Sequence, residues 1–250
     1  MNKRISVGAV SYLNTRPLLF GLKQSEALMD RITLIEDYPS KIAEKLLCNE
    51  IDIGLIPVAM IPKIQDAQIV TDYCIGTENE VVSVAIFSEV PLVEVDTILL
   101  DYQSRTSVNL AKILLKEFWN KEVNFVEATL DFRSKIKGTT AAVVIGDRAL
   151  EQIKLSEYMY DLGAAWKLHT GLPFVFAAWV ANKSLDELFL EEFNAANAFG
   201  VNHIKEVLTT VNYEGYDIEK YFTQNLSYTF TKEKREGLKL FLNKLEQLKG

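Results

Sequence analysis

Short apolar runs alternate along this sequence with segments of helical spacing, and this alternation constrains the fold more than any other feature. Four runs in the first part of the chain predict buried strands, at residues 5–10, 31–39, 51–59 and 81–88. The segment between the second and third runs is amphipathic, and we expect Ser40 to be the N-cap of a helix there. Strand–helix units of this length predict an α/β fold with mostly parallel sheets.

The alternation restarts after a break near residues 88–96, which suggests two lobes. Further strands are expected at residues 96–101, 123–128, 141–147 and 173–182. After Asn182 the pattern is helical almost to the end of the chain, and we expect this tail to return to the first lobe. The predicted lobes are therefore residues 1–88 together with 181–250, and residues 89–180.

Two polar rows stand where predicted strands end and helices begin. The first comprises residues 11–16, directly before Pro17, and the second comprises residues 104–107. Open α/β sheets bind ligands at the carboxyl ends of their strands, and two lobes place those ends across a shared cleft. We therefore expect both rows to face a cleft that binds a small anion.

The first row holds more polar side chains than a turn needs. Asn14 and Thr15 are neutral hydrogen-bond donors just before a helix, and Ser11 begins the row. An elaborate turn is an equally open interpretation, because Asn and Thr are common in turns. Ser83 lies inside an apolar run, where a buried hydroxyl bonded only to the backbone is the alternative to a ligand contact.

In the second row, Ser104, Thr106 and Ser107 lie where a helix starts, so that hydroxyls and free backbone N–H groups converge. Such donors at a helix amino terminus favour a carboxylate. The alternative is capping by a single hydroxyl beside a solvated Arg105, although capping needs only one such side chain. Asp147 also follows a strand and precedes a helix, and it is either an N-cap or a ligand contact.

The Gly-Leu-Pro turn offers a third set of polar groups. The Thr170 hydroxyl and the Gly171 backbone lie at this turn and are candidate ligand contacts. His169 and His203 are the only histidines, and a surface or core position is the favoured interpretation for both.

Composition and charge argue against several classes of function. The formal net charge is −7 and Lys and Arg form no cluster, which argues against nucleic acid or an anionic membrane as a partner. No segment approaches the roughly 18 apolar residues of a membrane span. Because Cys48 and Cys74 lack metal or redox spacing and no Gly-rich phosphate loop is present, we expect no metal and no cofactor. The first apolar run is too short for a secretory signal, so we expect a cytoplasmic protein with reduced thiols.

The sequence resembles the chorismate dehydratases of the futalosine route to menaquinone in five motifs that occur in the same order: VSYLNTRPL, DIGLIPVA, DYQSRTS, IGDRAL and DLGAAWKLHTGLPFVFAAW. The resemblance implies a fold like the type II periplasmic binding proteins, with two α/β lobes and a ligand cleft between them. It also implies the loss of water from chorismate to give 3-[(1-carboxyvinyl)oxy]benzoate. By position, the family's cleft residues would be Asn14, Ser83, Ser104, Arg105, Thr106, Thr170 and Gly171.

The chemistry of chorismate suggests roles for these candidates. We expect Asn14 and Ser83 to orient the reacting centre as catalytic residues, and residues 104–107 to hold a carboxylate. The other substrate-binding candidates are Ser11, Thr15, Arg105, Asp147, Thr170 and Gly171. No motif supplies a convincing base, so the substrate's own enolpyruvyl carboxylate is the expected proton acceptor, ahead of Asp147 or His169.

Two other functions stay open. The sister enzyme of the same pathway makes 1,4-dihydroxy-6-naphthoate, but the SYLNTRP and SRTS stretches fit the dehydratase better. A non-catalytic protein that captures a small anion has the same kind of fold, and the expected lack of an export signal opposes it.

Overall fold

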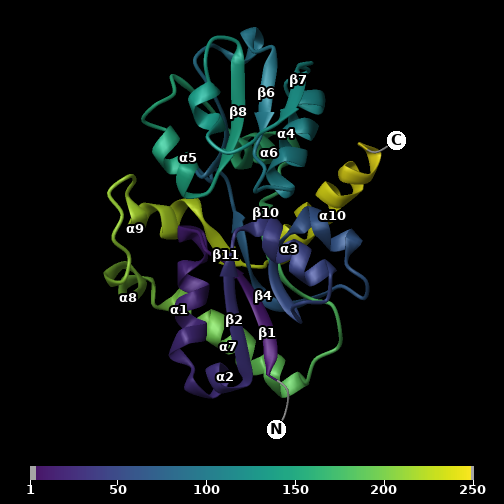
Figure 1. The fold of residues 1–250 in the computed structure, drawn as a ribbon, viewed down its shortest axis with the longest axis vertical. Helices are drawn as coiled ribbons and strands as arrows, with labels where there is room; N and C mark the ends of the chain where they lie inside the picture. Colours follow the sequence, from purple (N-terminus) through teal and green to yellow (C-terminus); the bar gives the residue numbers. More distant parts are fainter. Residues whose placement is uncertain (1–3, 249–250) are drawn as a thin grey trace.

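The strands form two separate β-sheets, which lie one above the other along the long axis of the molecule (Figure 1). The computed structural model describes residues 4–248. The first sheet has the order β11-β4-β10-β3-β1-β2 and consists of β1 (Ile5–Val10), β2 (Ile32–Asp37), β3 (Ile53–Pro57), β4 (Gln68–Thr77), β10 (Phe174–Ala181) and β11 (Ser227–Thr229). The second has the order β7-β6-β8-β5-β9 and consists of β5 (Val84–Ser88), β6 (Thr97–Leu100), β7 (Asn124–Glu127), β8 (Thr140–Ile145) and β9 (Tyr158–Asp161).

Both sheets are mixed, so the prediction of mostly parallel sheets was wrong. In the first sheet β1 is parallel to β2 and β3, whereas β10 is antiparallel to β3 and β4. In the second sheet β6 is parallel to β7 and β8, whereas β5 is antiparallel to β8 and β9. The chain enters β5 and β10 as it passes from one sheet to the other. Apolar periodicity does not reveal such a change of direction, because it reads the same along a strand in either direction.

The chain passes between the sheets at residues 78–83 and again at residues 162–173. The boundaries predicted from the sequence, at residues 88 and 180, differ from these passages, since they leave β5 with the first lobe and β10 with the second. The break that suggested the first boundary is a loop within the second sheet, around the short helix η3 (Leu92–Glu94). Residues 1–3 and 249–250, at the ends of the predicted first lobe, lie outside the described residues.

Helices connect most of the strands and pack against both sheets (Figure 1). They are α1 (Arg16–Gln24), α2 (Glu26–Arg31), α3 (Pro39–Leu47), α4 (Thr106–Glu117), α5 (Asp147–Gln152), α6 (Leu162–Thr170), α7 (Glu187–Asn202), α8 (Ile204–Thr209), α9 (Ile218–Lys220) and α10 (Lys232–Gln247). Ser40 is not the cap of α3: Tyr38 is the N-cap and Pro39 begins the helix, a position where a missing N–H costs nothing. Within residues 4–248, no helix has the length and apolar character that a membrane crossing requires.

The C-terminal segment departs from the nearly continuous helix that the sequence predicted. Between α9 and α10 lie a short π-helix, η5 (Tyr221–Asn225), and β11, which forms an edge of the first sheet beside β4. The fully buried Lys234 of α10 anchors β11, because its Nζ donates to the carbonyl oxygens of Ser227 and Thr229 at 3.0 and 2.7 Å. The tail therefore returns to the first sheet.

Candidate functional site

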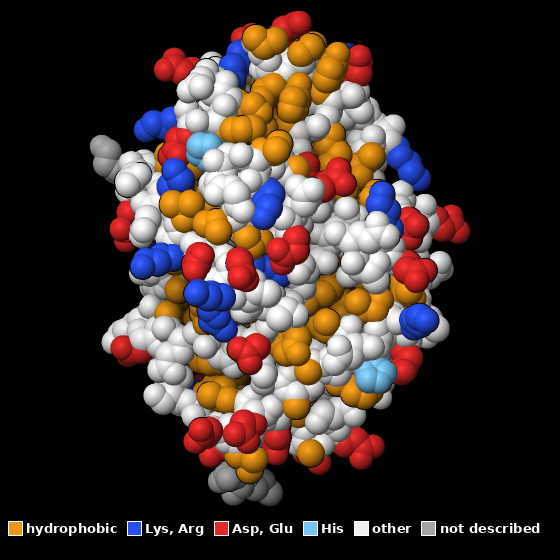
Figure 2. Space-filling view, turned by 180° about the vertical axis from the view of Figure 1, so that it is seen from behind, with side chains coloured by type: hydrophobic (Ala, Val, Ile, Leu, Met, Phe, Trp, Pro, Cys, Tyr) orange, Lys and Arg blue, Asp and Glu red, His pale blue; other side chains and the backbone are white. Residues whose placement is uncertain are grey.

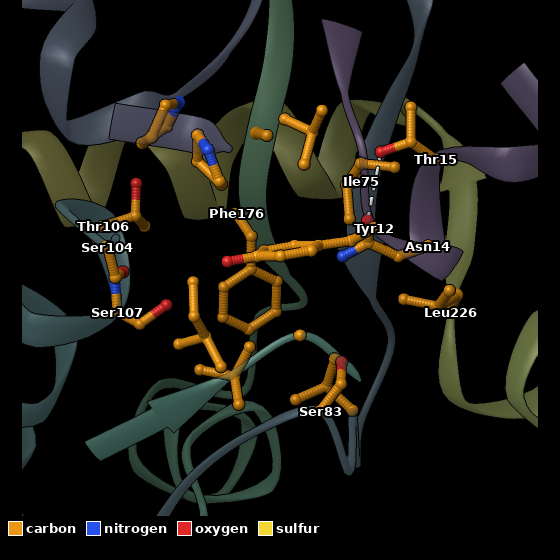
Figure 3. A pocket seen from close by; sticks show the side chains of 18 residues that line it. Tyr12, Asn14, Thr15, Ile75, Ser83, Ser104, Thr106, Ser107, Phe176 and Leu226 are labelled. Atoms are coloured by element: carbon orange, nitrogen blue, oxygen red, sulfur yellow. Dashed lines mark hydrogen bonds between the residues drawn. The ribbon is translucent and has the colours of Figure 1, made fainter. Parts of the chain in front are cut away.

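A cavity lies between the two sheets and receives polar side chains from both. These side chains are Tyr12, Asn14, Thr15, Ser83, Ser104, Thr106 and Ser107 (Figure 3). Apolar side chains, among them Ile75, Phe176 and Leu226, line much of the remainder. The two polar rows of the sequence thus meet at one cavity.

On the side of the second sheet, the start of α4 presents three buried hydroxyls. Ser104 Oγ accepts a hydrogen bond from the backbone N–H of Ser107, in the first turn of the helix, at 3.0 Å, although the N-cap residue itself is Arg105. Thr106 Oγ1 accepts from the backbone N–H of Ala59, just beyond β3 of the first sheet, at 3.2 Å. None of the three hydroxyls donates to another residue within 4–248, so their protons are available to a ligand. A hydrogen bond from Ser104 to the first turn of α4 therefore leaves the hydroxyl protons of this row available.

On the side of the first sheet, the short helix η1 (Leu13–Thr15) follows β1 and carries Asn14. Thr15 Oγ1 donates to Asn14 Oδ1 at 3.1 Å, which leaves the amide nitrogen of Asn14 pointing into the cavity (Figure 3). The backbone oxygen of Asn14 accepts from the Tyr228 hydroxyl of β11 at 3.0 Å. The Thr15 hydroxyl therefore orients the amide group as a hydrogen-bond donor, and the Tyr228 hydroxyl holds the backbone of the same residue.

Ser83 ends the first passage between the sheets and sits in a strained turn. Its backbone N–H donates to Val81 O at 2.7 Å, and the intervening Val82 has a φ of 58°, which is rare for a β-branched residue. Asp161 Oδ2 accepts from the N–H groups of Val81 and Val82, at 3.0 and 2.6 Å, and holds this turn. Burial raises the pKa of Asp161 to about 6. The sequence pattern placed Ser83 inside a strand, whereas β5 begins only at Val84.

Tyr12 crosses the cavity from the first sheet to the second and was not among the predicted site residues. Its hydroxyl donates to Gln103 Oε1, and burial raises its pKa well above the ordinary value. Arg148 Nη2 donates to the same Gln103 oxygen at 2.7 Å and to both carboxylate oxygens of Asp101, at 2.8 and 2.9 Å. Tyr12 therefore joins the lobes through a buried charged network. Because Tyr12 belongs to the first polar row, its position in the sequence could have identified it as a site residue.

Asp147 also connects the two sides rather than facing the cavity. It is the first residue of α5, whose N-cap is Gly146, so the predicted capping role was wrong. Its Oδ1 accepts from the backbone N–H of Leu13 at 3.0 Å. Burial raises its pKa to about 6, against the lowering effect of that hydrogen bond.

Two predicted binding residues lie on the outer surface. Ser11 is exposed, and its backbone N–H bonds to Asp37 O at 3.0 Å. The Arg105 guanidinium folds back onto the carbonyl oxygens of Tyr102 and Ser104, at 3.3 and 3.1 Å, and does not line the cavity. The structure therefore places neither side chain at the cavity.

The Gly-Leu-Pro turn also lies away from the cavity. Thr170 Oγ1 donates to Trp166 O at 2.8 Å within α6, and Gly171 is the left-handed residue that ends this helix, with a φ of 74°. His169 contacts Glu117 Oε2 at 3.3 Å on the outside, and His203 stacks on the Phe199 ring. The structure does not bring Thr170 and Gly171 to the site, because helix termination already occupies their polar groups.

The cavity itself is uncharged. Within residues 4–248, no Asp, Glu, Lys, Arg or His lines it, and no group of three His, Cys, Asp or Glu side chains is arranged to hold a metal. On the face seen in Figure 2, basic and acidic side chains are interspersed over the middle of the molecule, whereas acidic side chains gather at its lower end. The arrangement suits an anion held by neutral donors and a helix start.

Comparison with known sequences points to one pathway. The chain matches the family described as menaquinone biosynthesis over residues 5–247. It is also 25% identical over 263 residues to the chorismate dehydratase of Thermus thermophilus, a match that covers 96% of this chain and 94% of the relative.

Comparison with solved structures concerns the fold. Protein AF1704 of Archaeoglobus fulgidus superposes with a TM-score of 0.77 at 15% identity, covering 99% of this chain and 98% of that one. The Candida albicans CA3427 product, described as having the generic periplasmic binding protein fold, gives 0.63 at 14% identity, covering 98% and 90%. The alkanesulfonate-binding protein SsuA of Xanthomonas axonopodis pv. citri gives 0.64 at 11% identity, covering 98% and 92%. These likenesses confirm the predicted two-lobed fold of the type II periplasmic binding proteins.

Proposed function

Because this chain belongs to the menaquinone biosynthesis family, we propose that it removes water from chorismate to give 3-[(1-carboxyvinyl)oxy]benzoate. The relationship to a chorismate dehydratase supports a dehydratase activity. The observation that carries the specific proposal is the uncharged cavity, where hydroxyl and amide donors from both sheets converge. Chorismate offers them two carboxylates and a ring hydroxyl.

The reaction needs no external reagent. The C–H beside the enolpyruvyl ether is conjugated through a ring double bond to the ring carboxylate, so loss of that proton spreads negative charge onto the carboxylate oxygens. Expulsion of the neighbouring hydroxyl group then makes the ring aromatic, and the proton and hydroxide leave together as water. Donors against the ring carboxylate strengthen as its charge grows, and so they stabilise the transition state more than the substrate.

The two sides of the cavity have different tasks in this proposal. Ser104, Thr106 and Ser107 hold one of the two carboxylates at the start of α4, where their free hydroxyl protons and the helix end favour negative charge. Asn14 and Ser83 orient the reacting centre and the departing hydroxyl from the other side. Loss of one donor of this kind costs about 10²–10³ in rate.

The proton acceptor in this proposal is the enolpyruvyl carboxylate of the substrate. Among the described residues that line the cavity there is no ionisable acid–base group, apart from the Tyr12 phenol, which burial keeps protonated. Asp147 bonds to the Leu13 backbone and His169 lies on the outside. Asp147→Asn and His169→Gln should therefore retain turnover across the pH range. Loss of turnover with retained chorismate binding in either variant would contradict a substrate base.

Product analysis tests the function itself. Purified protein incubated with chorismate, without added metal or nucleotide, should form 3-[(1-carboxyvinyl)oxy]benzoate in an amount equal to the chorismate consumed. Ser104→Ala is the matched variant and should slow this conversion. Chorismate recovered unchanged would instead indicate anion binding alone, and formation of 1,4-dihydroxy-6-naphthoate from a cyclic futalosine derivative would indicate the sister activity.

A further inference from the structure

We propose that Tyr221, in the C-terminal segment, is a positioning residue that makes the Ser83 hydroxyl a hydrogen-bond donor to the substrate. The inference rests on the proposed function, and it assigns a task to a segment that lies far from both polar rows in the sequence. Tyr221 begins the π-helix η5 and is completely buried. Its hydroxyl donates to Ser83 Oγ at 2.7 Å, across 138 residues of sequence.

Ser83 lines the cavity and Tyr221 does not, so the phenol lies behind the serine. The backbone groups of Ser83 are already engaged, since its N–H donates to Val81 and its carbonyl oxygen accepts from Gly146 at 2.8 Å. The Ser83 hydroxyl accepts from Tyr221 and therefore directs its own proton elsewhere, and the cavity is the open side. The turn at Val82 fixes the position of the Ser83 hydroxyl, and the bond from Tyr221 fixes the direction in which that hydroxyl donates.

The direction of donation matters for the chemistry. A hydroxyl group that leaves a ring gains negative charge, so it is stabilised by a donor and not by an acceptor. Burial raises the pKa of Tyr221 well above its ordinary value, and the phenol therefore remains a neutral donor.

The surroundings of Tyr221 support a fixed position. Tyr216 packs edge-on against the Tyr221 ring at 6.3 Å between centroids, and its hydroxyl donates to Asn225 at 3.2 Å. In β11, which follows η5, the Tyr228 hydroxyl donates to the backbone oxygen of Asn14. π-helices occur frequently at functional sites.

A double-mutant cycle on kcat tests the inference. Tyr221→Phe keeps the ring and removes only the hydroxyl, so kcat for chorismate should fall about 10-fold, with KM changed by less than about 2-fold. Ser83→Ala should lower kcat by about 100-fold. Because Tyr221 acts through Ser83, adding Tyr221→Phe to Ser83→Ala should cause little further loss.

Tyr216→Phe is the matched control, since it removes a neighbouring hydroxyl of the same segment that has no bond to Ser83 or Asn14. It should retain kcat within about 2-fold. Wild-type protein that leaves chorismate unchanged would overturn the proposed function and this inference with it. Active wild-type protein would overturn the role of Tyr221 alone if Tyr221→Phe keeps full kcat, or if its loss is undiminished in the Ser83→Ala background.

Discussion

Gly146→Ala should destabilise the packing between the two lobes. Gly146 belongs to the second lobe, and its φ of 64° with a ψ of −149° is a conformation found almost only in glycine. A Cβ at this position would lie 2.8 Å from Cδ2 and Cε2 of Tyr12, which comes from the first lobe. The substitution therefore strains the backbone and drives a methyl group into a ring across the interface.

The cost has two parts. The backbone conformation contributes about 1–3 kcal/mol for a residue other than glycine. Overpacking against a fixed aromatic ring contributes roughly another 1–3 kcal/mol, because Tyr12 is held at its far end by Gln103. We expect a loss of about 2–6 kcal/mol in the free energy of unfolding, together with slower chorismate turnover.

Gly138→Ala is the control for this experiment. Gly138 also has a positive φ, of 56°, but a Cβ there would meet no atom within 4 Å, so only the backbone cost of about 1–2 kcal/mol applies. Urea unfolding followed by the fluorescence of the buried Trp166 and Trp179 gives both free energies. Equal losses of unfolding free energy in Gly146→Ala and Gly138→Ala would refute the interlobe clash. So would a Gly146→Ala loss that stays just as large when the Tyr12 ring is first removed by Tyr12→Ala.

Two carboxyl groups give further predictions. The folded-state pKa of Asp147 is raised from 3.8 to about 6, so the folded protein binds this proton more tightly than the unfolded chain and loses stability as pH rises from about 4 to 6. The unfolding free energy of the wild type relative to Asp147→Asn should therefore fall by about 3 kcal/mol over that range, and a constant difference would contradict it. Asp161→Asn should lower the free energy of unfolding by about 1–3 kcal/mol and should also lower kcat, because the Asp161 carboxylate holds the turn at Val82. A crystal structure of this variant should show Ser83 displaced. An unmoved Ser83 together with full kcat would contradict the prediction.

The sequence was most informative where function is local. The hydroxyls of residues 104–107 and the amide of Asn14 were recognised because each row sits at a strand end before a helix, and the structure brings both to one cavity. Thr170 and Gly171 had the same local appearance. Their polar groups form hydrogen bonds at the C-terminal end of α6. Residue spacing alone does not distinguish such a helix end from a ligand site.

The missed features depend on contacts between distant segments. Tyr221 bonds to Ser83 across 138 residues, and the sequence around either residue does not predict this contact. The left-handed conformation of Val82 opposes the preference of a β-branched residue, and only the surrounding structure, including Asp161, maintains it. The strand direction of β5 and β10 likewise depends on where the chain changes sheets.

The position of Ser83 has a mechanical consequence for this protein. The residue stands at the end of one of the two connections that join the sheets, so a rotation of one lobe against the other has to be absorbed next to it. The Ser83 hydroxyl is nevertheless bonded to Tyr221, whose segment continues into β11 of the first sheet, and Asn14 follows β1 of that same sheet. A rotation of the lobes would therefore move the hydroxyls of Ser104, Thr106 and Ser107, at the start of α4 beside the second sheet, relative to the pair formed by Asn14 and Ser83.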